Sequence, residues 1–253
     1  MKIGLIGYTG FVGGYLSEAF PGAALYNSSN ISDITGENFD LLLISAMPAE
    51  KWKANKFPEE DKATLESLKA AISDVQASSV LLISTVDVFE KPWRVSESSV
   101  PVCSATQAYG NNRRKFEEFI QTNFPQSWIV RLPGLVGTGL KKNVIFDIKH
   151  GKSTTGVPLN SVFQFYPMSR LRPDLKIVLQ SSPGIFHFAV EPISIFEICQ
   201  EFFLNEESFA PISAEAPSYD FRTERAMEWE KSGNYLLNKM ECLQEIGRYL
   251  NDI

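Results

Sequence analysis

Short apolar segments alternate with amphipathic segments through the first half of the chain. The short segments are residues 3–6, 23–26, 39–46, 80–85 and 128–132. Nearly continuous apolar runs of this length are typical of strands that are buried on both faces of a parallel sheet. Residues 11–20, 58–76 and 109–123 lie between them and repeat apolar positions every three or four residues, which predicts helices. The alternation predicts an α/β fold with a doubly wound parallel sheet.

The second half of the chain departs from this rhythm. Its patterns predict helices at residues 141–150, 173–179, 191–203 and 237–250, and strands at 162–166 and 185–190. We expect residues 1–135, completed by about 171–190, to form the domain with the sheet, and residues 136–170 and 191–253 to form a smaller lobe. Residues 47–57 follow neither period and predict a loop near the mouth of a ligand site.

Three glycines spaced three apart follow the first strand and precede the first helix: Gly7, Gly10 and Gly13. A strand, a glycine turn and a helix N-terminus in this order bring backbone N–H groups together, which suits the pyrophosphate of a dinucleotide. Gly7 would permit the turn, Gly10 the approach of the ligand and Gly13 the packing of helix on strand. The alternative is a glycine-rich turn that binds nothing. The position directly behind a clean strand favours the dinucleotide.

The end of the second strand faces the adenosine ribose in such a fold. An acidic residue there binds the ribose hydroxyl of NAD, but the chain places Asn27 and Ser28 at this point and no arginine for the NADP phosphate. Small polar groups favour NADP over NAD, although a polar exit from the strand explains these residues equally well.

The charge of the chain is uneven. The 253 residues carry a net charge of −6, which argues against a general nucleic-acid-binding surface. Residues 141–176, however, contain seven basic and two acidic side chains. A basic segment in an acidic protein suits a phosphorylated small ligand, and a solvated basic surface is an equal alternative.

Cysteine and histidine usage predicts neither a disulfide framework nor a metal site. Cys103, Cys199 and Cys242 are far apart in the sequence, and His150 and His187 have no metal-ligand spacing. The sequence shows no apolar leader and no run of the roughly 18–20 apolar residues that span a bilayer. We therefore expect a soluble, cytoplasmic protein without metal.

Four motifs occur in an order that resembles the extended short-chain dehydrogenases/reductases, in particular nucleotide-sugar epimerases, dehydratases and 4-keto-reductases. Residues 7–13 resemble the TGxxGFxG turn of that family. Ser84 to Phe89 is similar to its Ser-Ser/Thr-x-x-Val-Tyr/Phe strand end, Tyr109-Gly110 with Arg113 to its YGxxK helix start, and residues 131–137 to its R-x-x-x-V-Y/F-G strand exit. The resemblance covers nearly the whole chain and is strongest over residues 1–137. It implies a Rossmann-type sheet with a small C-terminal substrate-binding lobe.

The resemblance implies an NAD(P)-dependent enzyme in which Thr85, Tyr109 and Arg113 are catalytic. The tyrosine would exchange a proton with a sugar oxygen while hydride moves, and Thr85 would bond the same oxygen. Arg113 stands where the family has lysine, keeps the positive charge and cannot exchange a proton. The implied cofactor contacts are Gly7, Tyr8, Thr9, Gly10, Phe11, Val12, Gly13, Asn27, Ser28, Ser45, Ala46, Met47, Tyr109, Arg113, Leu132 and Pro133.

The substrate implied by the resemblance is a nucleotide-activated sugar. Its diphosphate would lie in the lobe that contains the basic segment, with Lys141, Asn143, Gln164 and Arg170 as candidate contacts. The run Thr85-Val86-Asp87 lacks the acid of the dehydratases, so 4-keto reduction or epimerisation is expected instead. The alternative is a regulator or scaffold that binds NAD(P) and has lost catalysis through Arg113.

The sequence does not determine the oligomeric state. The family often forms homodimers through the two helices expected here at residues 58–76 and 109–123. The outward faces of these helices are expected to carry Glu66, Lys69, Glu117 and Glu118, and such charge opposes a dry interface.

Overall fold

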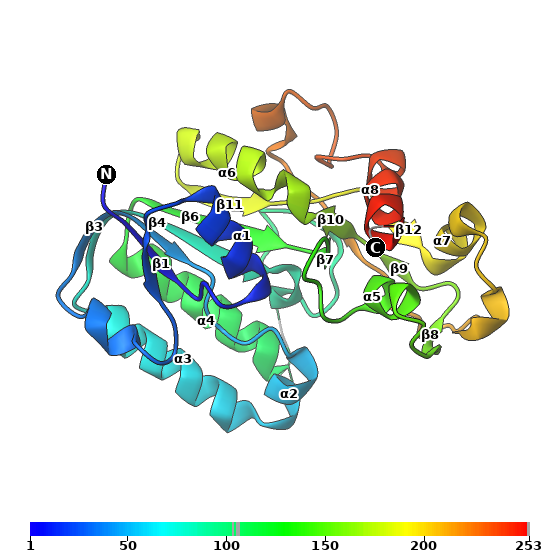
Figure 1. Cartoon of the computed structure of the whole chain (residues 1–253), viewed down its shortest axis with the longest axis horizontal. Helices are drawn as coiled ribbons and strands as arrows, with labels where there is room; N and C mark the ends of the chain where they lie inside the picture. Colours follow the sequence, from blue (N-terminus) through cyan, green and yellow to red (C-terminus); the bar gives the residue numbers. More distant parts are fainter. Residues whose placement is uncertain (103, 105–106, 252–253) are drawn as a thin grey trace. The chain divides into compact units, whose positions relative to one another are not determined.

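A parallel sheet is the centre of the first of two units into which the chain divides. The computed structural model describes residues 1–102, 104 and 107–251. Unit 1 comprises residues 1–90, 100–131 and 172–186, and unit 2 comprises residues 91–99, 132–171 and 187–253. Figure 1 shows the elements of both units.

Six strands form the sheet of unit 1. They are β1 (Ile3–Ile6), β2 (Ala24–Tyr26), β3 (Asn38–Ile44), β4 (Gln76–Thr85), β6 (Ser127–Leu132) and β11 (Gly184–His187). Their order is β11-β6-β4-β3-β1-β2, and β1 pairs in parallel with both β2 and β3, as β3 does with β4. The predicted doubly wound α/β fold of Rossmann type is confirmed.

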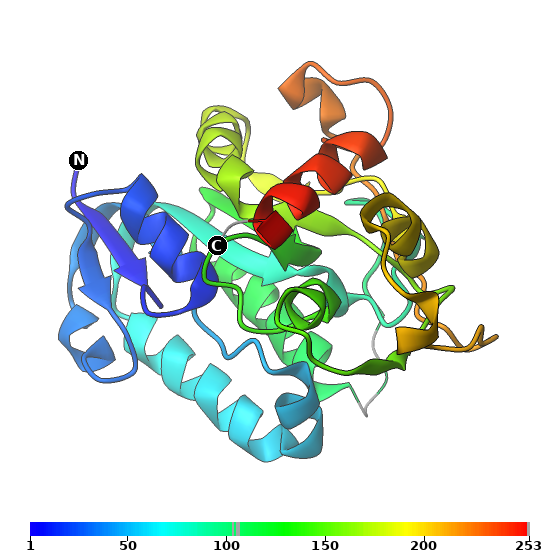
Figure 2. The same ribbon diagram turned by 45° about the vertical axis from the view of Figure 1, so that its right-hand side comes forward.

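Helices cover both faces of this sheet. Helices α3 (Pro58–Ile72) and α4 (Ala108–Asn123) pack side by side on one face. Helices α1 (Phe11–Ala19) and α6 (Leu171–Gln180) lie on the other (Figures 1 and 2). Doubly wound sheets need apolar strand residues on both faces, which explains the unbroken apolar runs of β3 and β4.

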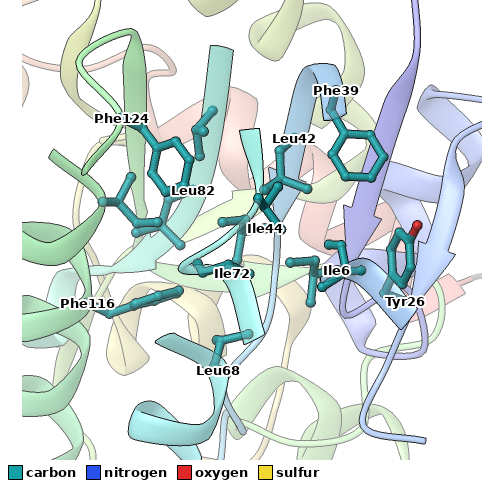
Figure 3. Close-up of a cluster of buried hydrophobic side chains, with 14 of the residues drawn as sticks. Ile6, Tyr26, Phe39, Leu42, Ile44, Leu68, Ile72, Leu82, Phe116 and Phe124 are labelled. Atoms are coloured by element: carbon teal, nitrogen blue, oxygen red, sulfur yellow. The ribbon is translucent and has the colours of Figure 1, made fainter. Parts of the chain in front are cut away.

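The main apolar core of unit 1 lies between the sheet and the layer of α3 and α4. Figure 3 shows Leu42 of β3 and Leu82 of β4 facing Ile72 of α3 and Phe116 of α4. All four are at most 2% exposed. Each such side chain contributes roughly 1.5–3 kcal/mol by its burial, so this layer fixes α4 against β4.

The chain reverses direction across the sheet between β2 and β3. After β2 it passes through one short turn, η1 (Ile31–Ile34), and crosses to the far side of β1. The carboxyl ends of β1 and β3 are therefore neighbours whose connections leave in opposite directions. In open α/β sheets such a point forms the ligand crevice.

Two predicted elements are wrong in detail. The segment expected to be a loop contains helix α2 (Lys51–Lys56), whose six residues are too few to show a helical period. The helix expected from residue 191 begins later, as α7 (Ile195–Phe202). Residues Ile193–Ser194 instead form β12, paired with β9 (Val162–Phe163), and Ser194 then caps α7 together with Glu197.

Unit 2 is built from short pairs of strands and three helices. The pairs are β7 (Gly134–Val136) with β10 (Phe165–Pro167), β8 (Thr154–Pro158) with β13 (Phe209–Ala210), β5 (Trp93–Val95) with β14 (Asp220–Phe221), and β9 with β12. Besides α7, the helices are α5 (Val144–Lys149) and α8 (Lys239–Asn251), and α8 packs against α5, α7 and β10. Throughout the described residues, no helix combines the length and the apolar character that crossing a membrane requires.

Candidate functional site

The glycine turn after β1 has two glycines that the protein itself requires. A Cβ atom at Gly7 would lie 2.4 Å from the carbonyl oxygen of Ser45, and the φ of Gly7 is +90°. A Cβ atom at Gly13 would lie 1.9 Å from the carbonyl oxygen of Gly7. At Gly10 the same oxygen is 3.4 Å away, and no other atom of the described residues lies within 4 Å. The fold therefore explains Gly7 and Gly13, whereas it leaves open space beside Gly10.

This turn fits a pyrophosphate. Gly10 is the first residue before α1, and its N–H donates to the oxygen of Gly7 at 3.0 Å. The N–H groups of Phe11 and Val12 open the helix, where unpaired donors and the helix dipole favour an anion. Thr9 is exposed beside them, and Tyr8, Phe11 and Val12 are half-buried. The turn thus supplies the donors and the space that a dinucleotide needs.

The end of β3 lies directly beside the turn. The N–H of Ser45 donates to the carbonyl oxygen of Ile6 at 2.9 Å, and Ser45, Ala46 and Met47 are half-buried. Met47 has a φ of +87°, a left-handed conformation that a side chain such as methionine rarely adopts. Backbone strain of this kind, of order 1–3 kcal/mol, is typical of functional sites.

The end of β2 is joined to the same turn by side chains. The amide of Asn27 donates to the hydroxyl of Tyr8 at 3.1 Å, and its oxygen accepts from the N–H and hydroxyl of Ser29. Ser28 is exposed. This group contains hydroxyls and amides but no charge, as the sequence indicates.

Thr85 and Tyr109 are brought together from β4 and α4. The hydroxyl of Thr85 is a neighbour of the Tyr109 hydroxyl and lowers its pKa. Its oxygen also accepts the N–H of Asp87 at 3.2 Å. Asn55 of α2 accepts the N–H of Tyr109 at 3.0 Å and so holds the first turn of α4. Two hydroxyls predicted to act on one oxygen are therefore neighbours.

Arg113 lies one turn further along α4 and stacks on Tyr109, with Cζ 3.8 Å from the ring centroid. Its Nη1 donates to Asp61 at 2.5 Å and to the carbonyl oxygen of Tyr109 at 3.1 Å, and its Nη2 donates to the oxygen of Pro48. Both charged side chains are buried. Asp61 looks in the sequence like a solvated acid in the first turn of a helix. In the structure it is the buried partner of Arg113, a role that no local pattern reveals.

The surroundings of Tyr109 keep its hydroxyl protonated. Burial raises the pKa of Tyr109 above its ordinary value of 10.0, and the carboxylate of Asp87 acts in the same direction. Arg113, Lys51 and the hydroxyl of Thr85 oppose this shift of the pKa and do not cancel it. The positive charge of Arg113 by itself lowers the pKa of Tyr109. The net direction is the reverse, because the hydroxyl is removed from water.

Arg131 and Glu117 form a second buried ion pair next to the site. Nε of Arg131 donates to Glu117 at 3.0 Å and Nη2 at 2.6 Å, and Ser84 donates to the same carboxylate. The expectation that Glu117 lies on the outer face of α4 is wrong, since its side chain is 3% exposed. Its position four residues after Arg113 and eight after Tyr109 places all three on one helix face, and this spacing could have revealed it. The network joins β4, α4 and β6.

Unit 2 contains the residues predicted to bind substrate. Gln164 is buried, and its amide bonds the backbone of Val190 and Phe221. Asn143 caps α5 by accepting the N–H of Phe146 and donates to Leu135. These two side chains are engaged within their unit. Lys141 is exposed, Arg170 is half-buried, and Leu132 and Pro133 are buried at the end of β6.

The cysteines and acidic groups offer no metal site in the part of the chain that the structure describes. Cys199 and Cys242 are buried free thiols, and Cys103 lies outside the described residues. No group of three or more metal-ligating side chains occurs among the residues described.

Comparison with known proteins identifies the fold. The chain matches no protein-family model and no curated protein sequence. It is similar to the solved structure of a dTDP-4-dehydrorhamnose reductase from Yersinia enterocolitica, with a TM-score of 0.71, 17% identity and 98% of each chain covered. A UDP-N-acetylglucosamine 4-epimerase from Bacillus cereus gives 0.66, 17% and 100% of each chain. MoeE5 in complex with UDP-glucose and NAD gives 0.74, 15% and 98% of each chain. The chain therefore has the fold of the extended short-chain dehydrogenases/reductases.

Proposed function

We propose that this chain is an NAD(P)-dependent oxidoreductase or epimerase that acts at a keto or hydroxyl carbon of a nucleotide-activated sugar. The observation that carries the proposal is that Thr85 and Tyr109 are neighbours in the unit that also contains the glycine turn. Solved structures with the same fold include one in complex with NADP and one with UDP-glucose and NAD. This agreement supports a nicotinamide cofactor and a nucleotide-sugar substrate.

The proposed roles follow from the chemistry of each group. The turn from Gly7 to Gly13 holds the pyrophosphate, Asn27 and Ser28 face the adenosine ribose, and residues 45–47 line the approach to the nicotinamide. A bound reduced nicotinamide would supply hydride to a carbonyl carbon of the substrate. Tyr109 is placed to donate its proton to the carbonyl oxygen, and Thr85 to hydrogen-bond that oxygen. Lys141 and Arg170 are the side chains proposed for the substrate diphosphate.

The test is turnover with a panel of nucleotide 4-keto-sugars and nucleotide hexoses, each with NADPH, NADH and the oxidised cofactors. Tyr109→Phe removes the proton donor and leaves the ring that Arg113 stacks on, so the fold is retained. We expect a loss of turnover of about 100-fold or more, which is typical of general acid catalysis. Equal rates in both proteins would remove Tyr109 from the mechanism.

The hydrogen bonds of Arg113 favour a second function, the binding of NAD(P) without turnover. Its donors to Asp61, Pro48 and the backbone of Tyr109 hold the guanidinium within the protein. A chain that binds NAD(P) and no longer turns it over would have this arrangement. Arg113→Lys discriminates the two functions, because a large gain in turnover identifies the natural chain as impaired. A loss identifies the arginine as an adapted part of the site.

A further inference from the structure

The ion pair between Lys51 and Asp87 also acts on Tyr109. Nζ of Lys51, at the start of α2, is 2.6 Å from Oδ1 of Asp87 in the short helical turn η2 (Val86–Val88). Both α2 and η2 pack against α4. The N–H of Asp87 donates to the hydroxyl of Thr85, so the backbone that carries this carboxylate is held beside a neighbour of Tyr109. The charges of Lys51 and Asp87 both act on the Tyr109 hydroxyl, with opposite sign.

The two ion pairs around Tyr109 differ in their access to water. Arg113 and Asp61 are 6% and 5% exposed, so solvent barely reaches their charges. Lys51 and Asp87 are 41% and 18% exposed. A buried pair of fixed charges is constant under all mild conditions, because separating it costs several kcal/mol. The electrostatic effect of a partly solvated pair, in contrast, can be changed by a bound ligand or a substitution.

We propose that Lys51 and Asp87 are positioning residues that act on the Tyr109 hydroxyl through their opposite charges. Asp87 offsets part of the effect of Arg113 and Lys51, and burial of the hydroxyl raises its pKa further. The hydroxyl therefore retains its proton for an acceptor oxygen. The use of that proton in carbonyl reduction rests on the proposed function, whereas the proton affinity itself does not.

The two members of the pair have opposite expected effects. Loss of the Asp87 carboxylate removes a charge that raises the pKa of Tyr109, and loss of the Lys51 ammonium removes a charge that lowers it. A charge close to a titrating group moves its midpoint by about one pH unit or more. A merely structural role of the pair predicts no such opposition.

The test is a titration of Tyr109 in the full chain without cofactor or substrate. A difluorotyrosine introduced at position 109 loses its proton at lower pH than tyrosine, and fluorine NMR reports this residue alone. We expect Asp87→Asn to lower the midpoint by about one pH unit and Lys51→Met to raise it by about one. Lys53→Met removes the same charge from an exposed position of α2 and serves as the control, with an unchanged midpoint.

Unchanged midpoints in Asp87→Asn and Lys51→Met overturn the proposal, and so do shifts of the same sign. This result is independent of whether the chain turns over any sugar. If turnover is found, the pH profile of kcat/KM provides the second readout. A donor is active while protonated, so the alkaline limb moves to lower pH in Asp87→Asn and to higher pH in Lys51→Met.

Discussion

Single residues at the glycine turn separate what the fold needs from what a ligand needs. The clash at Gly13 is with a backbone oxygen, and α1 cannot approach β1 if a side chain is present there. The space at Gly10 is open on the protein side. The same pattern of three glycines in the sequence thus contains positions of two physical kinds.

Gly13→Ala is therefore expected to destabilise the protein, whereas Gly10→Ala is not. A methyl group at position 13 would have to displace the carbonyl of Gly7, and overpacking of this kind costs about 1–3 kcal/mol. At position 10 the contact of 3.4 Å to the same oxygen needs little movement. Urea unfolding followed by circular dichroism measures both free energies of unfolding. Equal stability of Gly13→Ala and the natural chain would contradict the close packing of α1 on β1.

At the scale of elements, α4 organises the candidate site. One of its faces presents Tyr109, Arg113 and Glu117. Tyr109 lies near Thr85 of β4, Arg113 pairs with Asp61 of α3, and Glu117 pairs with Arg131 of β6. Phe116 and Ile120 on the adjacent positions are buried in the apolar core. Apolar packing thus holds the helix on the sheet, and polar contacts orient its side chains at the site.

Asp61→Asn tests the buried contact between α3 and α4. The substitution leaves Arg113 buried beside a neutral amide, and breaking a buried pair costs about 3 kcal/mol or more. Glu66→Gln is the matched control on the same helix, because Glu66 pairs with Lys69 at an exposed position and its loss changes stability by about 0.5 kcal/mol or less. Thermal unfolding of the two variants compares them. Equal costs would mean that the Arg113 pair is solvated.

The strand pair β5–β14 provides a prediction of pH dependence. Burial by itself raises the pKa of Asp220, but hydrogen bonds from Arg222 and Tyr235 outweigh it and hold the pKa below its ordinary value of 3.8. A lowered folded-state pKa contributes stability that is present above about pH 4 and is lost as the pH falls through the folded value.

Asp220→Asn is therefore expected to reduce the free energy of unfolding at neutral pH and to flatten its decline below about pH 4. Urea unfolding at a series of pH values measures this. The exposed Asp33→Asn controls for the loss of one carboxylate. An unchanged acid slope in Asp220→Asn would show that this ion pair makes no difference between the folded and unfolded states.

At the scale of the whole molecule, the stability of the chain should depend on its proposed cofactor. A ligand that binds only the folded state stabilises it by about 2.7 kcal/mol at a concentration 100 times its Kd. For a chain of this size, that corresponds to a rise in Tm of roughly 5–10 °C. NADPH and NADH are compared by calorimetry at matched concentrations, and the uncharged end of β2 favours the larger shift with NADPH.

Gly10→Val is the control for this measurement, since its side chain would occupy the open side of the turn. We expect no rise in Tm with either cofactor in this variant, with the Tm of the free protein largely retained. A rise equal to that of the natural chain would place the dinucleotide elsewhere.

The sequence by itself determined the alternation of strands and helices, the position of the glycine turn and the order of the four motifs. These features are local: a buried strand, an amphipathic helix and a tight turn each restrict the residues within a few positions of one another. For this reason the predicted sheet and most of its helices agree with the structure. The short α2 and the late start of α7 were not predicted, because one or two turns of helix show too little periodicity in the sequence.

Only the tertiary structure decided which charges face which. Arg113 binds Asp61, 52 positions earlier in the chain, and Lys51 binds Asp87, 36 positions later. Glu117 binds Arg131 in the interior and not solvent at the surface. An acid in the first turn of a helix and an acid on a helix face look alike in a sequence whether they are solvated or buried. The partners of Asp61 and Glu117 depend on how α3 packs on α4 and how α4 packs on the sheet. This packing brings distant polar groups together away from water, where a charge is stable only beside an opposite charge.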